Sequence, residues 1–169
     1  MSHLHDDQDT STATEEDVAK IRDLVKDAKI CMLTTINADD MLVSRPMSTQ
    51  QIEFDGAAWF FAKADQPKVA EIEANPHVNA AYSESAYVSM SGHAEIVRDD
   101  AKKKDLWNDQ AAAWLQAEPT DDSVVLIKVV PDTVEYWDTP STPSTILGRL
   151  KAKVTGDRPD GGENDTVDL

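Results

Sequence analysis

Lys68 stands at a place in the chain where a cation is unusual. Residues 57–62 predict a strand with a bulky apolar centre, and residues 67–74 predict a short helix after a tight turn. Asp65 or Gln66 is the expected N-cap, with Pro67 in the first turn. A cation there opposes the helix dipole, whereas exposed amides together with a lysine would suit a phosphate group. The alternative is a solvated lysine in a surface turn.

Arg45 is the second candidate for anion binding. It precedes Pro46 within residues 41–52, which predict a strand. Proline interrupts the hydrogen-bonded ladder, so it marks an edge strand or a bulge. An arginine in an interrupted strand needs an anionic partner or solvent. Arg45 and Lys68 therefore form a candidate cationic pair for the phosphoryl end of a ligand.

Other side chains with chemical potential favour structural roles. Cys31 lies in an apolar run, where a lone cysteine is typical of a buried small hydrophobe. Trp107 and Trp114 are seven residues apart and share a helical face if the helix is unbroken, so core packing explains them as well as ring stacking. No residue stands out as a general acid or base, and no catalytic side chain or metal ligand is assigned.

The elements that position these residues alternate between strands and helices. Thr14 and Asp17 predict a capping box at the start of the first helix, and Gly92 predicts a bulge or a close backbone approach within a strand. Strands joined mainly by hairpin turns give a mostly antiparallel sheet, and about seven of them can curl into a barrel. The predicted class is α+β with a β-barrel core, made of strands at 30–36, 41–52, 57–62, 78–83, 87–97, 124–130 and 133–138 and helices at 14–28, 67–74, 99–108, 110–117 and 144–154.

Length and charge limit the classes of function. The 169 residues suit one domain, predicted over 14–155, between acidic tails at 1–13 and 156–169. A net charge of -16, from 32 acidic and 16 basic side chains, disfavours nucleic acid and anionic membranes as partners. A salt-adapted host would produce the same balance. One cysteine and no long apolar run predict a cytoplasmic protein.

Short motifs in a fixed order give the chain a family resemblance. None is specific alone, but their order and spacing from Thr14 to the C-terminus resemble the flavin-binding split barrels related to pyridoxamine 5'-phosphate oxidase, in the branch of general stress proteins. The motifs are Ser44-Arg45-Pro46-Met47, Asp55-Gly56 before Trp59-Phe60-Phe61, Lys68 with Glu71-Ile72, Asn75-Pro76, Tyr87-Val88-Ser89-Met90-Ser91-Gly92, Leu106-Trp107, Glu135-Tyr136-Trp137-Asp138 and Gly156-Asp157-Arg158-Pro159-Asp160.

The resemblance implies a split barrel of six to seven strands that binds FMN, or another flavin such as FAD or a deazaflavin, in a cleft between the two subunits of a homodimer. Arg45 and Lys68 match the residues that bind the FMN phosphate. The remaining matches lie around the flavin. Pro46 and Met47 match the strand backbone along the isoalloxazine ring, Phe61 and Ala62 match the pair at the end of the next strand, and Trp107 matches a helix-borne tryptophan near the flavin.

The chain also departs from the family pattern. Ala62 replaces a common threonine and Gln66 a common serine or threonine, and each lost hydrogen bond to the phosphate would cost about 1.5–3 kcal/mol. Gln50 stands where the true oxidases have a lysine, so oxidation of pyridoxamine 5'-phosphate itself is not expected. The function expected is a flavin-dependent oxidoreductase with an unknown substrate. The alternatives are a non-catalytic flavin-binding or flavin-sequestering stress protein, and a dimerisation module whose flavin site has decayed.

Overall fold

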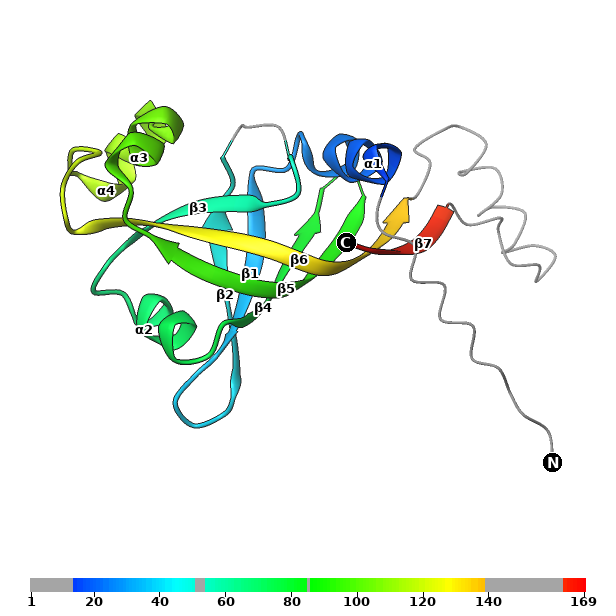
Figure 1. Ribbon diagram of the computed structural model, residues 1–169, viewed down its shortest axis with the longest axis horizontal. Helices are drawn as coiled ribbons and strands as arrows, with labels where there is room; N and C mark the ends of the chain where they lie inside the picture. Colours follow the sequence, from blue (N-terminus) through cyan, green and yellow to red (C-terminus); the bar gives the residue numbers. More distant parts are fainter. Residues whose placement is uncertain (1–13, 51–53, 85, 139–162) are drawn as a thin grey trace, which may run out of the picture.

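The computed structural model describes residues 14–50, 54–84, 86–138 and 163–169 (Figure 1). The elements along the chain are α1 (Glu15–Val25), β1 (Ile30–Ile36), β2 (Leu42–Ser48), β3 (Ala58–Lys63), α2 (Pro67–Ala74), β4 (His77–Ser83), β5 (Tyr87–Val97), α3 (Asp100–Leu106), α4 (Asp109–Leu115), β6 (Val124–Asp138) and β7 (Glu163–Asp168). The predicted helix at 144–154 and the tail at 1–13 lie outside the described residues.

One antiparallel sheet organises the fold. Its strand order is β2-β1-β4-β5-β6-β3, and β7 also pairs with β6. The long β6 pairs with β5 along one side, while on its other side Val124–Val129 pair with β3 and Thr133–Asp138 with β7. Among the described residues β2 and β3, at the two ends of this order, form no ladder with each other, so the barrel stays open. This confirms the predicted α+β split barrel.

The core fills the inside of the curled sheet. Inward residues alternate with outward ones on each strand, as half-buried strands require, and the buried set includes Leu33, Phe60, Met90 and Ile127. Helix α1 covers one opening of the barrel with Ile21, which has no exposed surface. The predicted capping box at its start is confirmed, since the Thr14 hydroxyl accepts from the Asp17 amide and the Asp17 carboxylate accepts from the Thr14 amide.

A bulge explains why β6 is one strand where the sequence predicted two. Ser91 pairs with Thr133 and Gly92 with Pro131, so Asp132 is the extra residue and the ladder continues past the proline. The predicted irregularity at Gly92 is confirmed. A Cβ on Gly92 would lie 2.1 Å from the Val130 carbonyl oxygen, so the two strands approach too closely for any side chain there.

The C-terminal residues differ from the predicted acidic tail over 156–169. Glu163–Asp168 form β7 along the half of β6 that β3 does not reach. Backbone groups rather than side chains make this ladder, so acidic composition does not prevent it. Val167 and Leu169 pack against the core while Thr166 and Asp168 face solvent. The alternation of apolar and polar residues over 166–169 is typical of a strand, but the acidic composition of 156–169 favoured a tail instead.

Candidate functional site

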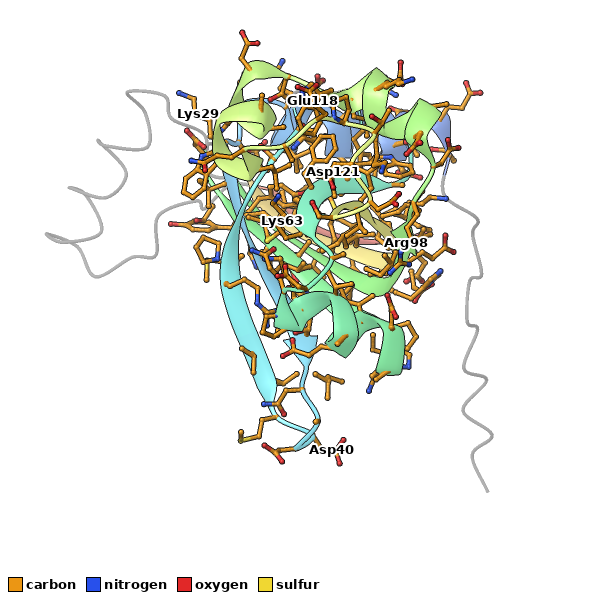
Figure 2. The ribbon with its side chains drawn as sticks, turned by 90° about the vertical axis from the view of Figure 1, so that its left-hand side faces the viewer. Lys29, Asp40, Lys63, Arg98, Glu118 and Asp121 are labelled. Carbon is orange, nitrogen blue, oxygen red and sulfur yellow. The ribbon has the colours of Figure 1, made fainter. Side chains whose placement is uncertain are left out.

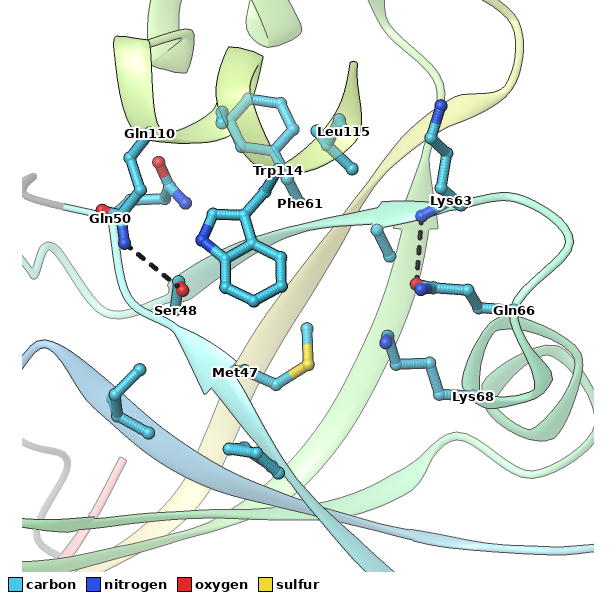
Figure 3. A pocket seen from close by; sticks show the side chains of 14 residues that line it. Met47, Ser48, Gln50, Phe61, Lys63, Gln66, Lys68, Gln110, Trp114 and Leu115 are labelled. Atoms are coloured by element: carbon cyan, nitrogen blue, oxygen red, sulfur yellow. Dashed lines mark hydrogen bonds between the residues drawn. The ribbon is translucent and has the colours of Figure 1, made fainter. Parts of the chain in front are cut away.

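A pocket of about 350 Å³ opens at the gap between β2 and β3, the two end strands of the sheet, which do not pair with each other (Figure 3). Its size falls within the range of small-molecule sites, about 300–1,000 Å³. β2, β3, the start of α2 and one face of α4 supply its walls. The lining residues are Ile30, Pro46, Met47, Ser48, Gln50, Phe61, Ala62, Lys63, Gln66, Lys68, Gln110, Ala111, Trp114 and Leu115.

The lining is mostly apolar, and the described part of it contains lysines but no carboxylate. Figure 3 shows Lys68 pointing into the pocket from α2, on the side opposite Gln50 and Ser48. Lys63 points away, with its Nζ 3.4 Å from the Ser123 hydroxyl. In a chain with 32 acidic side chains, a pocket without one favours an anionic ligand with a large apolar part.

Lys68 is half-buried and lies close to another cation. Burial lowers the pKa of its ammonium from the usual 10.5, and the positive charge of Arg45 lowers it further, while Glu71 acts in the opposite direction. Within the described residues its Nζ has no hydrogen bond and no ion pair. A bound anion would supply that missing partner, so the arrangement fits a phosphate group.

Gln66 shapes the turn between β3 and α2. It is the N-cap residue of α2, one of the two residues predicted for that place, but its side chain makes no capping bond to the helix. Its Oε1 instead accepts a hydrogen bond from the Lys63 amide at 3.2 Å. The oxygen is therefore used within the turn, and the NH₂ end is the part of the side chain that can donate to an anion.

Helix α4 covers the pocket and presents an aromatic side chain to it. Trp114 is 78% exposed, and in Figure 3 its indole lies over Met47. The helix begins at Asp109 behind the N-cap Asn108, whose Nδ2 donates to Gln50 Oε1 at 2.7 Å. Gln110 on α4 donates to Ser48 at 3.5 Å. These side-chain bonds tie α4 to the end of β2.

A buried lysine anchors the same region from behind. Lys103 on α3 is 1% exposed, and its Nζ lies 2.9 Å from Asp100 Oδ1. It also donates to the carbonyls of Asp121 at 3.3 Å and Val124 at 3.1 Å. Figure 2 shows Asp121 near Lys63, at the end of the molecule where the chain enters β6. Lys103 thus fixes α3 and the loop after α4 to the start of β6.

Arg45 lies in a closed polar triangle beside the pocket. Its guanidinium donates to the Thr35 hydroxyl at 2.6 Å and to Glu71 Oε2 at 2.9 Å. The Thr35 hydroxyl donates to the same carboxylate oxygen at 2.6 Å. Thr35 is fully buried, and the side chains of Arg45 and Glu71 are only 20% and 15% exposed. The anionic partner that the sequence required for Arg45 is therefore present within the chain, on α2.

The pocket brings together most of the residues that the sequence singled out. It is lined by Pro46, Met47, Phe61, Ala62, Gln66 and Lys68. Arg45 and Trp107 do not line it. Trp107 is the C-cap residue of α3 and packs edge-on against Phe61, with ring centroids 5.2 Å apart.

Trp114 is the main lining residue that the sequence analysis did not assign to the site. The sequence allows core packing as well as stacking for Trp107 and Trp114, on a shared helical face. The structure has α3 ending at Leu106 and α4 starting at Asp109, so the two tryptophans share no helical face. The structure shows Trp114 exposed over the pocket rather than in the core. No local pattern marks Trp114 for the site, because only the fold brings α4 over the pocket.

Comparison with known proteins gives matches over nearly the whole chain. Residues 16–160 match the sequence profile of the family described as pyridoxamine 5'-phosphate oxidase like. A candidate general stress protein 26 from Jannaschia sp. CCS1 is 26% identical, with a TM-score of 0.74 over 92% of this chain and 100% of that one. The general stress protein 26 of Bacillus anthracis is 28% identical, with a TM-score of 0.63 over 70% of this chain and 92% of that one.

A further similar structure is that of a flavin-binding protein. The general stress FMN/FAD-binding protein of Xanthomonas citri is 29% identical, with a TM-score of 0.65 over 76% of this chain and 93% of that one. A search of curated proteins gives no match. Within the described residues, no helix has the length and apolar character that crossing a bilayer requires.

Proposed function

Because the chain belongs to the pyridoxamine 5'-phosphate oxidase-like family, we propose that it binds FMN in the pocket between β2 and β3 and works as a flavin-dependent oxidoreductase. The observation that carries this proposal is Lys68, a half-buried ammonium with no hydrogen bond or ion pair among the described residues, in an otherwise largely apolar pocket. FMN combines an anionic phosphate with a flat, largely apolar ring system, which matches that combination.

The residues present fit the cofactor. Lys68 and the NH₂ of Gln66 would hold the phosphate, with Arg45 adding positive charge from behind. Met47, Phe61 and Trp114 would contact the ring and keep water from it. Ala62 is 1% exposed and offers no hydroxyl, so this site depends on Lys68 more than a site with threonine would. A bound flavin supplies electron or hydride transfer, and the protein supplies binding and orientation. We assign no catalytic side chain.

A homodimer with the cofactor between its subunits completes the proposal, and an uncharged sheet face supports it. The outward residues are Ile30, Met32, Thr34 and Ile36 on β1, Leu42, Ser44, Pro46 and Ser48 on β2, His77, Asn79, Ala81 and Ser83 on β4, and, over the part of β5 that pairs with β4, Tyr87, Ser89, Ser91 and His93. None of them is Asp, Glu, Lys or Arg, and the next outward residue of β5, the exposed Glu95, lies beyond the end of the β4 ladder. Leu42 and Tyr87 are 76% and 59% exposed. Ile30 and Pro46 also line the pocket, so the face and the pocket adjoin.

A second candidate is a protein that binds or sequesters flavin without turnover. The lack of a carboxylate or histidine among the described lining residues favours it, because those are the common proton-transferring groups. Flavin-dependent oxidation of a reduced nicotinamide would support the enzyme. Tight binding with no turnover of any tested donor would support sequestration.

Titration with FMN, riboflavin, FAD and a deazaflavin, followed by flavin absorbance, tests the proposal. We expect FMN to bind more tightly than riboflavin, and Lys68→Ala to weaken FMN by about 10- to 100-fold while leaving riboflavin nearly unchanged, since one charge-assisted bond to phosphate is lost. Lys104→Ala, which removes an exposed lysine of α3, is the matched control. Equal losses for FMN and riboflavin would show that Lys68 does not bind the phosphate.

A further inference from the structure

Glu71 is placed to oppose the binding of an anion in the pocket. It lies three residues after Lys68 on α2, so both side chains project from the same side of the helix. Its carboxylate accepts hydrogen bonds from both Arg45 and Thr35. It is also close enough to raise the pKa of the Lys68 ammonium, against the effects of burial and of Arg45. One carboxylate is thus in electrostatic contact with both cations of the site.

We propose that Glu71 sets how strongly the site prefers a phosphate-bearing ligand over an uncharged one. It does so by holding Arg45 in an ion pair within the protein. This inference rests on the proposed phosphate site at Lys68. With Glu71 present, Arg45 (+1), Lys68 (+1) and Glu71 (−1) sum to one positive charge, against about −1.5 to −2 on a phosphate monoester at neutral pH. Without the carboxylate charge, the site carries two positive charges and Arg45 is free to turn to the ligand.

The geometry of the triangle makes this competition direct. Thr35 holds the carboxylate from the inner wall of the barrel, and Arg45 reaches it with one NH₂ group while another nitrogen contacts Thr35. A phosphate beside Lys68 would have to draw Arg45 from Glu71, or bind without it. Either way, the carboxylate lowers the affinity for a phosphate-bearing ligand and leaves the affinity for an uncharged one unchanged.

The variant Glu71→Gln tests the inference, because glutamine keeps the shape and an acceptor oxygen for Thr35 and Arg45. We expect it to raise the affinity for FMN about tenfold or more and to leave riboflavin unchanged, as one charge-assisted bond is gained. Glu73→Gln is the matched control: it removes the same charge from the same helix, but Glu73 is exposed and pairs with Arg98 at 2.9 Å. A merely structural role for Glu71 would give weaker binding of both ligands.

A second measurement separates this inference from the proposed function. Inorganic phosphate should raise the melting temperature of Glu71→Gln more than that of the wild type, and adding Arg45→Ala should cancel the gain. If the phosphate effect appears without flavin binding, the inference holds and the flavin proposal fails. If the wild type binds FMN but Glu71→Gln improves neither FMN nor phosphate binding, the inference fails and the flavin proposal stands.

Discussion

At the scale of single residues, Lys68 shows the cost of a preformed ligand site. A half-buried ammonium without an acceptor loses hydration, and the neighbouring Arg45 adds repulsion, so the folded protein lowers the pKa of Lys68. The unfolded chain restores the ordinary value of 10.5. The folded chain therefore binds fewer protons than the unfolded one between those two pKa values, and the free energy of unfolding rises with pH across that window.

We expect Lys68→Met to stabilise the ligand-free protein at neutral pH, since it removes a desolvated charge and keeps an apolar stem. The variant should also lose part of the rise in stability between neutral pH and pH above 10.5 that the wild type shows. Urea unfolding at neutral and alkaline pH measures both effects. Lys104→Met, on an exposed face of α3, should change neither, and an unstable Lys68→Met protein would contradict the account.

At the scale of elements, α4 acts as a cover whose position depends on polar side chains. Asn108 and Gln110 attach it to Gln50 and Ser48, and Lys103 fixes the loop that follows it. The helix therefore presents Trp114 to the pocket although that side chain is 78% exposed. A large aromatic group exposed beside an apolar pocket favours contact with a flat ligand.

Trp114→Ala should weaken FMN and riboflavin by the same factor, because the indole would contact the ring system and not the phosphate. Stacking of a flat heterocycle on an aromatic side chain contributes about 1–3 kcal/mol, or about 5- to 150-fold in affinity. Trp114→Phe should retain most of it. The flavin titration described above measures the effect, and a loss specific to FMN would place Trp114 elsewhere in the site.

The sequence predicted elements with strong local patterns and missed those that depend on partners. The capping box at Thr14, the irregular pairing at Gly92 and the burial of Cys31 follow from local chemistry and are confirmed. Burial raises the pKa of the Cys31 thiol to about 12. β7 depends on an unpaired edge of β6, which no local pattern reveals. The contact of Glu71 with Arg45 joins residues 26 positions apart, so only the folded sheet brings them together.

At the scale of the whole molecule, the distribution of charge matters more than its sum. The chain carries a net charge of -16, yet the outward positions of β1, β2, β4 and the part of β5 that pairs with β4 include no Asp, Glu, Lys or Arg; Glu95 follows on β5 just beyond this face. Two subunits of equal charge repel each other over long distances. An interface free of charge keeps the repelling groups apart when the subunits meet.

We expect the protein to be a dimer whose association strengthens as salt is added, because salt screens that repulsion. Met32→Glu, at a position 41% exposed in the centre of the face, should shift it toward monomer. Ala101→Glu on the exposed side of α3 is the charge-matched control. Sedimentation velocity at low and high salt gives the result, and an unchanged dimer in Met32→Glu would move the interface to another face.

The open gap between β2 and β3 has one more consequence. No described backbone hydrogen bond joins these two strands, so whatever fills the pocket becomes the link between the margins of the sheet. A bound molecule then takes the place of the hydrogen bonds that are missing between β2 and β3. When it leaves, both strands become more mobile together. Amide hydrogen exchange should accordingly slow in β2 and β3 in concert when the pocket fills, while the central β5 and β6, paired on both sides, change little.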